Sequence, residues 1–312
     1  MTSMQAWLDE QLADAGISRT GAVRVERERA WGTVLTAPTT GGPVWLKAPG
    51  PDTVFEVALY ELLGSVVPDR VPVPLAVDMS RGWLLLPDGG EPLPDDDPAA
   101  LTSVLAAYGA MQRDLSSHVD GLLAAGLADM RPAAMPDRFT EALDVTGRYV
   151  ATHGAPGDRT ALDRIARLRP RFDEWCARLA ESPVPASIDH NDLHPGNVFA
   201  AGPRFYDWGD AVVAHPFASM LVALGFLHFR HGAPAADPLL ARARDAYLEP
   251  FTDLAPRASL VAEVELACRV GKVARALTWD RAVRATGYDG EFGRAPLETL
   301  LALDADWFSL QA

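Results

Sequence analysis

The sequence contains no long hydrophobic run and only two cysteines. No apolar stretch reaches the roughly eighteen residues that a membrane-spanning helix needs, and residues 1–16 carry acidic side chains where a signal peptide has basic ones. We therefore expect a cytoplasmic protein with no membrane partner. Cys176 and Cys268 lie in helical patterns with apolar neighbours and show no metal-ligand spacing. This pattern predicts two buried free thiols.

Basic residues are scarce, and lysine is the scarcest of them. The net charge of −14 argues against nucleic acid as a partner, because binding its phosphates requires a basic surface. An acidic surface suits either a cationic substrate or simple solubility. Only two of the 28 basic residues are lysines, Lys47 and Lys272. An ammonium is more compact than the planar guanidinium fork, so a lysine at position 47 is suited to reach between phosphates.

Residues 187–210, SIDHNDLHPGNVFAAGPRFYDWGD, hold the most informative polar side chains of the chain. Asp192 and Asn197 are followed by Asp207 after a Gly-Pro turn between apolar runs, which predicts a loop leading into a short β-hairpin. In phosphoryl transfer, the protein supplies a base for the accepting hydroxyl and oxygen ligands for Mg²⁺. Asp192 suits the first role, and Asn197 and Asp207 suit the second.

The run HNDLHPGN (190–197), followed by Tyr206-Asp207-Trp208, resembles the catalytic and metal-binding loops of the aminoglycoside phosphotransferase and choline kinase superfamily. These enzymes are small-molecule relatives of the protein kinases. The resemblance implies that Asp192 is the catalytic base, that Asn197 and Asp207 hold Mg²⁺, and that His190 braces the loop. It also implies ATP as the phosphoryl donor and a small-molecule hydroxyl as the acceptor.

Lys47 lies in a strand-like stretch near the amino terminus. Residues 22–37 and 43–48 read as a β-hairpin joined by a glycine turn, and residues 53–63 as an amphipathic helix that Gly64 ends. A buried lysine needs a carboxylate or a bound anion, whereas a lysine on an exposed edge strand does not. The resemblance implies that Lys47 contacts the ATP phosphates and that Glu56 of the helix pairs with it. Glu61 is the alternative partner.

Other nucleotide contacts follow only from the resemblance. The chain near residues 30–33 is expected to form a flap over the phosphates, with a close backbone approach at Gly32 and a hydroxyl from Thr33. The GxGxxG pattern of many kinases is absent here. Two more strands are expected over residues 71–76 and 82–87. The backbone around Leu86 is expected to meet the adenine.

The implied fold is α+β, a protein-kinase-like fold of two lobes. Its β-rich nucleotide-binding lobe takes residues 1–88, a hinge or linker rich in glycine, proline and acid takes 89–97, and a helical lobe takes 98–312. A short packing helix is expected at 4–15. In the helical lobe, apolar spacing predicts helices over 98–117, 121–130, 135–153, 158–182, 217–231, 238–247, 257–284 and 296–308.

The chain departs from the family pattern in two places. Asn191 stands where glycine is more common. The carboxylate that opens the helix after the metal-binding loop, and would brace the catalytic loop, is replaced by Ser219. Either Ser219 or Asp210 could substitute, or the brace is lost. A further group on the late helix, Lys272, Arg275, Trp279 and Asp280, belongs either to the acceptor pocket or to a solvated face with the tryptophan in the core.

Three questions of function stay open at this point. The alternation of His190, Asp192 and His194 would suit zinc if the segment were extended, but Pro195-Gly196 indicates a loop. A pseudokinase-like module that binds a nucleotide or metabolite without turnover is the alternative to a kinase. The sequence does not identify the acceptor, for which antibiotics, amino alcohols and sugars are all candidates. Nor does it specify ATP over GTP or the oligomeric state.

Overall fold

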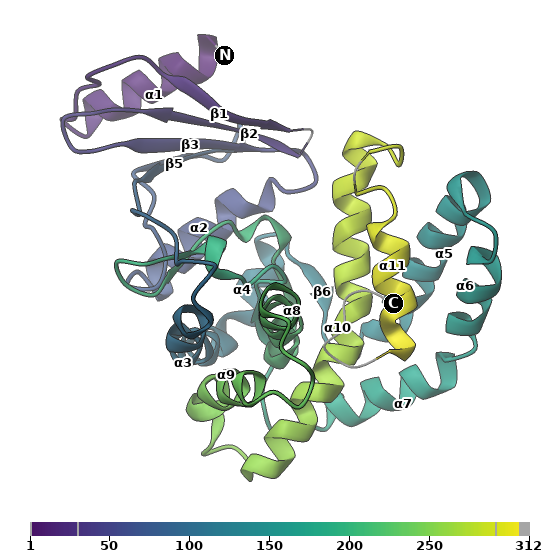
Figure 1. Cartoon of the computed structure of the whole chain (residues 1–312). Coiled ribbons are helices and arrows are strands. Elements are labelled where there is room, and N and C mark those ends of the chain that lie inside the picture. Colours follow the sequence, from purple (N-terminus) through teal and green to yellow (C-terminus); the bar gives the residue numbers. More distant parts are fainter. Residues whose placement is uncertain (1, 30, 291, 306–312) are drawn as a thin grey trace.

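The computed structural model describes residues 2–29, 31–290 and 292–305 (Figure 1). The amino-terminal region holds a five-stranded antiparallel sheet in the order β1-β2-β3-β5-β4. Its strands are β1 (Arg24–Arg29), β2 (Gly32–Ala37), β3 (Val44–Pro49), β4 (Ala76–Asp78) and β5 (Trp83–Pro87). A mainly helical region follows, which confirms the expected α+β class.

The two faces of this sheet pack against different cores. Helix α1 (Thr2–Asp14) covers the outer face, and its Trp7, Leu8 and Leu12 form a small core with the strands. Helix α2 (Phe55–Val66) lies on the inner side, and its buried residues belong to the large core that continues into the helical region. Side chains alternate along a strand, so Leu46 of β3 enters the outer core while Lys47 faces inward.

Some of the expected strands and their neighbours have different bounds. The stretch 22–37 is itself a hairpin of β1 and β2, and β2 pairs with β3 across the expected glycine turn. The strand expected over 71–76 is wrong, since pairing starts only at Ala76. Pro72 and Pro74 lack the N–H that a ladder requires. Helix α2 continues through Gly64 to Val66 instead of ending at the glycine.

The helical region is built around one long helix, α10, which packs against α5, α7, α8, α9 and α11. Cys176 and Cys268 are buried free thiols, as predicted. Across the described ranges, no helix combines the length and apolar character needed to cross a membrane. The helices are α3 (Pro98–Leu115), α4 (Val119–Ala124), α5 (Met135–His153), α6 (Asp158–Ala166), α7 (Arg169–Ala180), α8 (Met220–His231), α9 (Pro238–Leu248), α10 (Arg257–Thr286) and α11 (Ala295–Leu301).

The predicted helices agree with the structure except at three places. The stretch 158–182 is two helices, and Pro170 in the first turn of α7 marks the break. The stretch 121–130 contains the end of α4 and then a strand, β6 (Ala128–Met130). The last predicted helix is shorter, because α11 gives way to a 3₁₀ turn, η6 (Ala302–Asp304), and positions 306–308 lie outside the described residues.

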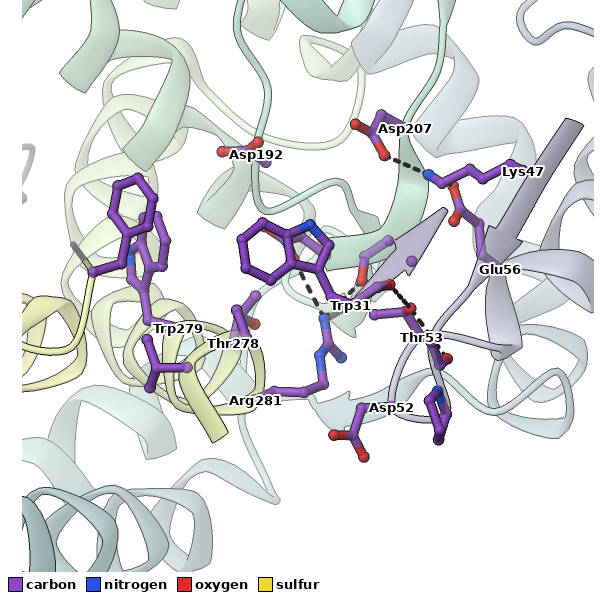
Figure 2. A pocket seen from close by; sticks show the side chains of 18 of the residues that line it. Trp31, Lys47, Asp52, Thr53, Glu56, Asp192, Asp207, Thr278, Trp279 and Arg281 are labelled. Atoms are coloured by element: carbon purple, nitrogen blue, oxygen red, sulfur yellow. Dashed lines mark hydrogen bonds and ion pairs between the residues drawn. The ribbon is translucent and has the colours of Figure 1, made fainter. Parts of the chain in front are cut away.

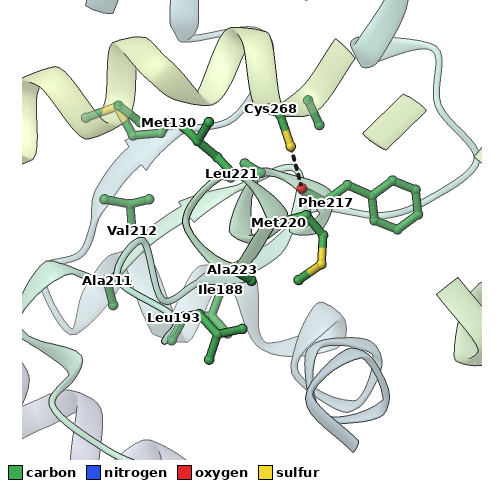
Figure 3. Packing of buried hydrophobic residues seen from close by; sticks show 14 of the residues in the cluster. Met130, Ile188, Leu193, Ala211, Val212, Phe217, Met220, Leu221, Ala223 and Cys268 are labelled. Atoms are coloured by element: carbon green, nitrogen blue, oxygen red, sulfur yellow. Dashed lines mark hydrogen bonds between the residues drawn. The ribbon is translucent and has the colours of Figure 1, made fainter. Parts of the chain in front are cut away.

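The segment with the polar motif alternates between short strands and tight turns. Strand β10 (Val212–Ala214) pairs with β6 on one side and with β7 (Ser187–Asp189) on the other, in the order β6-β10-β7. Strand β8 (Val198–Phe199) pairs with β9 (Arg204–Phe205) as the predicted hairpin. Ile188 of β7, Val212 of β10 and Leu193 of the intervening loop are fully buried in the core (Figure 3). The 3₁₀ turns are η1 (Ser116–His118), η2 (Pro195–Asn197), η3 (Trp208–Asp210), η4 (Pro216–Ser219) and η5 (Glu249–Phe251).

The segment between the sheet and α3 is attached to this hairpin over part of its length. Leu93 N donates to Val198 O at 2.8 Å, and Ala200 N donates to Glu91 O at 2.9 Å. Gly89 lies so close to Phe199 that an added Cβ would be 2.1 Å from the phenyl ring. The connection therefore runs against the element that leads into Asp207.

Candidate active site

The loop after β7 places Asp192 at the mouth of a pocket. The backbone turns at Asn191, whose φ of 59° lies in the left-handed region that asparagine tolerates better than most residues. Asn191 N donates to Asp189 Oδ1 at 2.8 Å, and its side chain donates to Thr278 Oγ1 at 2.8 Å. The asparagine thus supplies both the turn that glycine would allow and an anchor to α10.

Asp192 is held by partners on both carboxylate oxygens. Arg275 of α10 donates to Oδ1 at 2.8 Å, and Asn197 Nδ2 lies 3.3 Å from Oδ2 and 2.9 Å from the Asp192 carbonyl. His194 Nε2 lies 3.5 Å from Oδ2. Burial acts to raise the pKa of the Asp192 carboxyl, but Arg275 and His194 outweigh it and hold the pKa well below its ordinary value. Asp192 is ionised at neutral pH.

His190 is a buried structural residue, in keeping with its implied role. Its Nε2 donates to Tyr206 O at 2.9 Å, and its ring lies 4.5 Å from that of Trp208. Burial lowers the pKa of the imidazole. The neutral ring thus ties the loop to the residue before Asp207. In the described part of the chain, no group of three or more His, Cys, Asp and Glu side chains is placed to hold a metal ion, so the zinc alternative has no support in the structure.

Lys47, Glu56 and Asp207 meet between the sheet and the helical region (Figure 2). Lys47 Nζ lies 2.6 Å from Glu56 Oε1 and 2.5 Å from Asp207 Oδ1. Burial acts to lower the pKa of Lys47, but the two carboxylates reverse this and raise it. Of the two glutamates left open by the sequence, Glu56 is buried and meets the lysine, while Glu61 is exposed.

Asp207 stands at a sharp turn of the backbone. Its φ of 62° is left-handed, and its N–H donates to Tyr60 Oη at 3.3 Å. Tyr60 lies four residues after Glu56, on the same side of α2, so one helix contacts both Lys47 and the backbone of Asp207. Lys47 has the largest effect on the Asp207 carboxyl and lowers its pKa.

The carboxylate that the resemblance leads us to expect beneath the loop is supplied by neither Ser219 nor Asp210. Ser219 Oγ donates to Asp189 Oδ1 at 2.6 Å, and the same oxygen accepts from Asn191 N. The carboxylate beneath the catalytic loop therefore belongs to Asp189, with Ser219 as its donor. Asp210 is engaged elsewhere, by Arg275 at 2.9 Å and by Arg281 at 3.5 Å.

Arg275 is the residue that joins these groups. It is 6% exposed, and one of its nitrogens bonds both the Asn191 carbonyl and Asp210 while another bonds Asp192. Its guanidinium also lies 4.8 Å from the centre of the Trp279 ring. Lys272 and Asp280 of the same helix are not among the described residues that line the pocket. Lys272 donates to Ala302 O and Asp280 pairs with Arg284, so both stabilise the fold.

The pocket runs between the sheet and α10. Among the residues described, five carboxylates and four cations line it, so the charge of −14 is not concentrated there. Trp279 and Phe292 stack at 5.3 Å on the α10 side, and Trp31 faces them from the sheet side (Figure 2). The charged lining residues are Asp52, Glu56, Asp192, Asp207, Asp210, Arg27, Lys47, Arg275 and Arg281.

The other residues predicted to contact the nucleotide are Gly32, Thr33 and Leu86, and they differ in where they lie relative to the pocket. Gly32 lines the pocket, and a Cβ there would lie 3.1 Å from Ala48 O. Thr33 pairs with Ala48 on the opposite face of the sheet and is not among the lining residues described. Leu86 pairs with Trp45 on the inner face beside the linker, with its side chain in the large core.

Asn197 and Asp207 are suited to a magnesium ion by their chemistry. The amide nitrogen of Asn197 is used by Asp192, which leaves its carbonyl oxygen for another partner. Both carboxylate oxygens of Asp207 face cations, Lys47 at 2.5 Å and Arg27 at 3.9 Å. Hard oxygen donors beside a site that already attracts positive charge match the preference of Mg²⁺.

Sequence reasoning missed three residues of this site: Asp189, Tyr60 and Arg27. Arg275 was noticed but left between two interpretations, because only the fold brings α10 to Asp192. Asp189 directly precedes the motif and had no separate signal. Tyr60 could have been found, since it lies one helical turn after Glu56.

Comparisons with known proteins agree with this geometry. Residues 19–260 match the family profile described as "Phosphotransferase enzyme family". No curated relative matches the sequence. Similar solved structures include a macrolide 2'-phosphotransferase type I, at 17% identity and a TM-score of 0.59, with 95% of this chain and 96% of that chain covered.

Two further structures share the fold. A choline/ethanolamine kinase family protein from Mesorhizobium loti is 16% identical, with a TM-score of 0.58 over 97% of this chain and 95% of that one. A spectinomycin phosphotransferase solved with ADP and spectinomycin is 11% identical, with a TM-score of 0.57 over 96% of this chain and 98% of that one. At these identities the likeness concerns the fold alone.

Proposed function

Because the chain belongs to the phosphotransferase enzyme family, we propose that it transfers the γ-phosphoryl group of MgATP to a hydroxyl of a small molecule. The observation that carries this proposal is that Asp192, Asp207 and Lys47 line one pocket although they come from distant parts of the chain. A carboxylate base, a metal-binding carboxylate and a phosphate-binding cation are the groups that phosphoryl transfer requires.

In this proposal each group has a role set by its surroundings. Asn197 and Asp207 would hold Mg²⁺, which would neutralise charge on the phosphates. Lys47, positioned by Glu56, contacts the phosphates, and Gly32 and the backbone at Leu86 contact the rest of the nucleotide. On nucleotide binding, Lys47 exchanges part of its contact with Asp207 for phosphate oxygens.

Asp192 orients the acceptor hydroxyl toward the phosphoryl group. Its low pKa makes it a weak base, so it accepts the proton late, after the bond to phosphorus has largely formed. Arg275 keeps one carboxylate oxygen occupied and so limits how the carboxylate can rotate. The acceptor then lies against Trp279 and Phe292, which line the same pocket on the α10 side.

The acceptor side of the pocket favours ring-bearing alcohols over simple cations. The carboxylates nearest α10, Asp192 and Asp210, are both paired with arginines. Stacked aromatic rings bind planar or apolar faces of a ligand.

We propose lobe boundaries at 1–88 and 98–312, with the hinge in 89–97.

The test is coupled ADP release with MgATP over a panel of hydroxyl-bearing antibiotics, amino alcohols and sugars. Wild type is expected to release ADP only with an acceptor and with Mg²⁺. Asp192→Asn and Asp207→Ala are expected to lose this release while keeping a wild-type circular dichroism spectrum. Full turnover in either variant contradicts the assigned roles. Nucleotide binding without turnover of any acceptor favours the pseudokinase-like module.

A further inference from the structure

Three adjacent strands place Arg27, Val34 and Lys47 in one row across the sheet. Arg27 of β1 pairs with Val34 of β2, and Val34 pairs with Lys47 of β3. Paired residues share a face, and all three line the pocket. Strands lie about 4.8 Å apart, so the two cations project into the pocket from backbones about 10 Å apart.

The side chains of the two cations converge on one carboxylate. Arg27 NH1 lies 3.9 Å from Asp207 Oδ2, and Lys47 Nζ lies 2.5 Å from Oδ1. Lys47 is also bound by Glu56, whereas the Arg27 side chain is 58% exposed and its contact with Asp207 is long. Arg27 is therefore placed over the proposed metal ligand with most of its guanidinium available to an anion.

A β-bulge determines which charge occupies this position. The register passes from Val25↔Leu35 to Arg27↔Val34, so Glu26 is the extra residue on β1. Without the bulge, Glu26 would pair with Val34 and place a carboxylate over the pocket. The extra residue moves an arginine into that place. The same shift turns Arg29 to this face, but of the two only Arg27 is among the described residues that line the pocket.

From this arrangement we infer that Arg27 binds the terminal phosphoryl group of the nucleotide. The inference rests on the proposed function and extends it to a residue that distinguishes nucleoside triphosphate from diphosphate. Lys47, deeper on β3 and fixed by Glu56, serves the inner phosphates. Arg27 belongs to the sheet and lies beside Asp207. The residues proposed to contact the acceptor, Trp279 and Phe292, line the α10 side of the pocket. The guanidinium fork matches the geometry of phosphate oxygens.

The test is the affinity of the full-length protein for a non-hydrolysable ATP analogue, ADP and AMP, measured by isothermal titration calorimetry with Mg²⁺. Arg27→Gln is expected to weaken the triphosphate about tenfold and to change ADP and AMP binding about twofold or less. Arg27→Glu is expected to weaken the triphosphate further. Arg24→Gln is the matched control: Arg24 also lies on β1, at its amino-terminal end, has a side chain that is 73% exposed, and is not among the described pocket-lining residues.

Several outcomes would overturn the inference. Equal losses of affinity for the triphosphate and the diphosphate in Arg27→Gln would mean that Arg27 does not contact the terminal phosphoryl group. An equal loss in Arg24→Gln would mean that the effect is general surface charge. If wild type binds none of the three nucleotides, the proposed function itself fails. If wild type binds the nucleotides and Arg27→Gln binds them with the same affinities, this inference is rejected while the proposed function stands.

Discussion

Ser219 Oγ lies 2.6 Å from Asp189 Oδ1 and donates its proton to that carboxylate. Since a hydroxyl has one proton, Tyr108, whose hydroxyl oxygen lies 2.9 Å from Ser219 Oγ, must be the donor to the serine. Gln112 donates to the same serine at 3.1 Å. The carboxylate beneath the loop therefore comes from Asp189 at the end of β7, and the serine connects it to α3.

Moving the carboxylate from position 189 to position 219 tests this arrangement. Ser219→Asp alone places a second carboxylate against Asp189 and should destabilise the fold by about 2–4 kcal/mol, because two like charges are then buried together. Adding Asp189→Asn should recover at least half of that loss. The measurement is the free energy of unfolding in urea for both single variants and the double variant. Additive losses would show that the two positions do not interact.

Asp189 should also affect how stability depends on pH. Burial is the largest influence and raises the pKa of its carboxyl to about 6, although Ser219 and the N–H of Asn191 act to lower it. The folded protein then binds a proton that the unfolded chain releases near pH 4, so the stability from this group falls as pH rises from about 4 to about 6. The linked free energy is at most about 3 kcal/mol.

Asp189→Asn should flatten this part of the stability profile. Chemical denaturation at several pH values between 4 and 7 measures the slope. Asp289→Asn serves as the control, since the Asp289 side chain is 97% exposed. A slope unchanged in Asp189→Asn would assign the pH dependence to other groups.

Arg275→Gln should impair the chemical step more than nucleotide binding. Without the guanidinium, Asp192 loses a hydrogen bond and its pKa rises, so activity should be lost on acidification at a higher pH than in wild type. We expect kcat to fall about 10- to 100-fold, with the KM for ATP changed about twofold or less. The pH profile of kcat is the decisive measurement.

The control for Arg275 is Arg284→Gln on the same helix, where the arginine is exposed and pairs with Asp280. Burying Asp192 and Asp210 without their shared partner should also lower the melting temperature of Arg275→Gln. An unshifted pH profile with reduced stability would limit Arg275 to a structural role.

The two glutamates of α2 form a second matched pair. Glu56→Gln replaces the fully buried partner of Lys47 with a neutral side chain, and we expect turnover to fall about 10- to 100-fold because the lysine loses its fixed position. Glu61→Gln changes an exposed residue and should leave turnover within about twofold. ADP release measured on both variants checks this. Equal effects would contradict the role given to Glu56.

The local part of the site could be predicted because its residues are close in sequence. Asp192, Asn197 and Asp207 lie within sixteen positions, and spacing there reflects the geometry of one loop and one hairpin. Lys47 was found through an unusual choice of residue type. These signals need no knowledge of how distant segments pack.

The rest of the site depends on contacts between distant elements. Arg275 reaches Asp192 across 83 positions, and an arginine within an amphipathic helix gives no indication of its partner. Arg27 sits in a strand of alternating charges, where a single bulge decides whether an arginine or a glutamate faces inward. The pattern alone does not contain the bulge. Similarly, the prolines at 72 and 74 were outweighed by apolar neighbours in the prediction of a strand.

The attachment of the linker to the β8–β9 hairpin restricts how the sheet can move over the pocket. Asp88 N is bonded to Pro43 O on one side, and the chain from Glu91 to Leu93 is bonded to the hairpin on the other. Only Gly89 and Gly90 lie between these anchors, and Gly90 has a φ of 86°. A free nine-residue tether would span about 30 Å and let the halves drift apart. Any rotation of the sheet over the pocket would have to be absorbed within these two residues, and Arg204, which donates to Gly89 O at 3.3 Å, restricts the first of them.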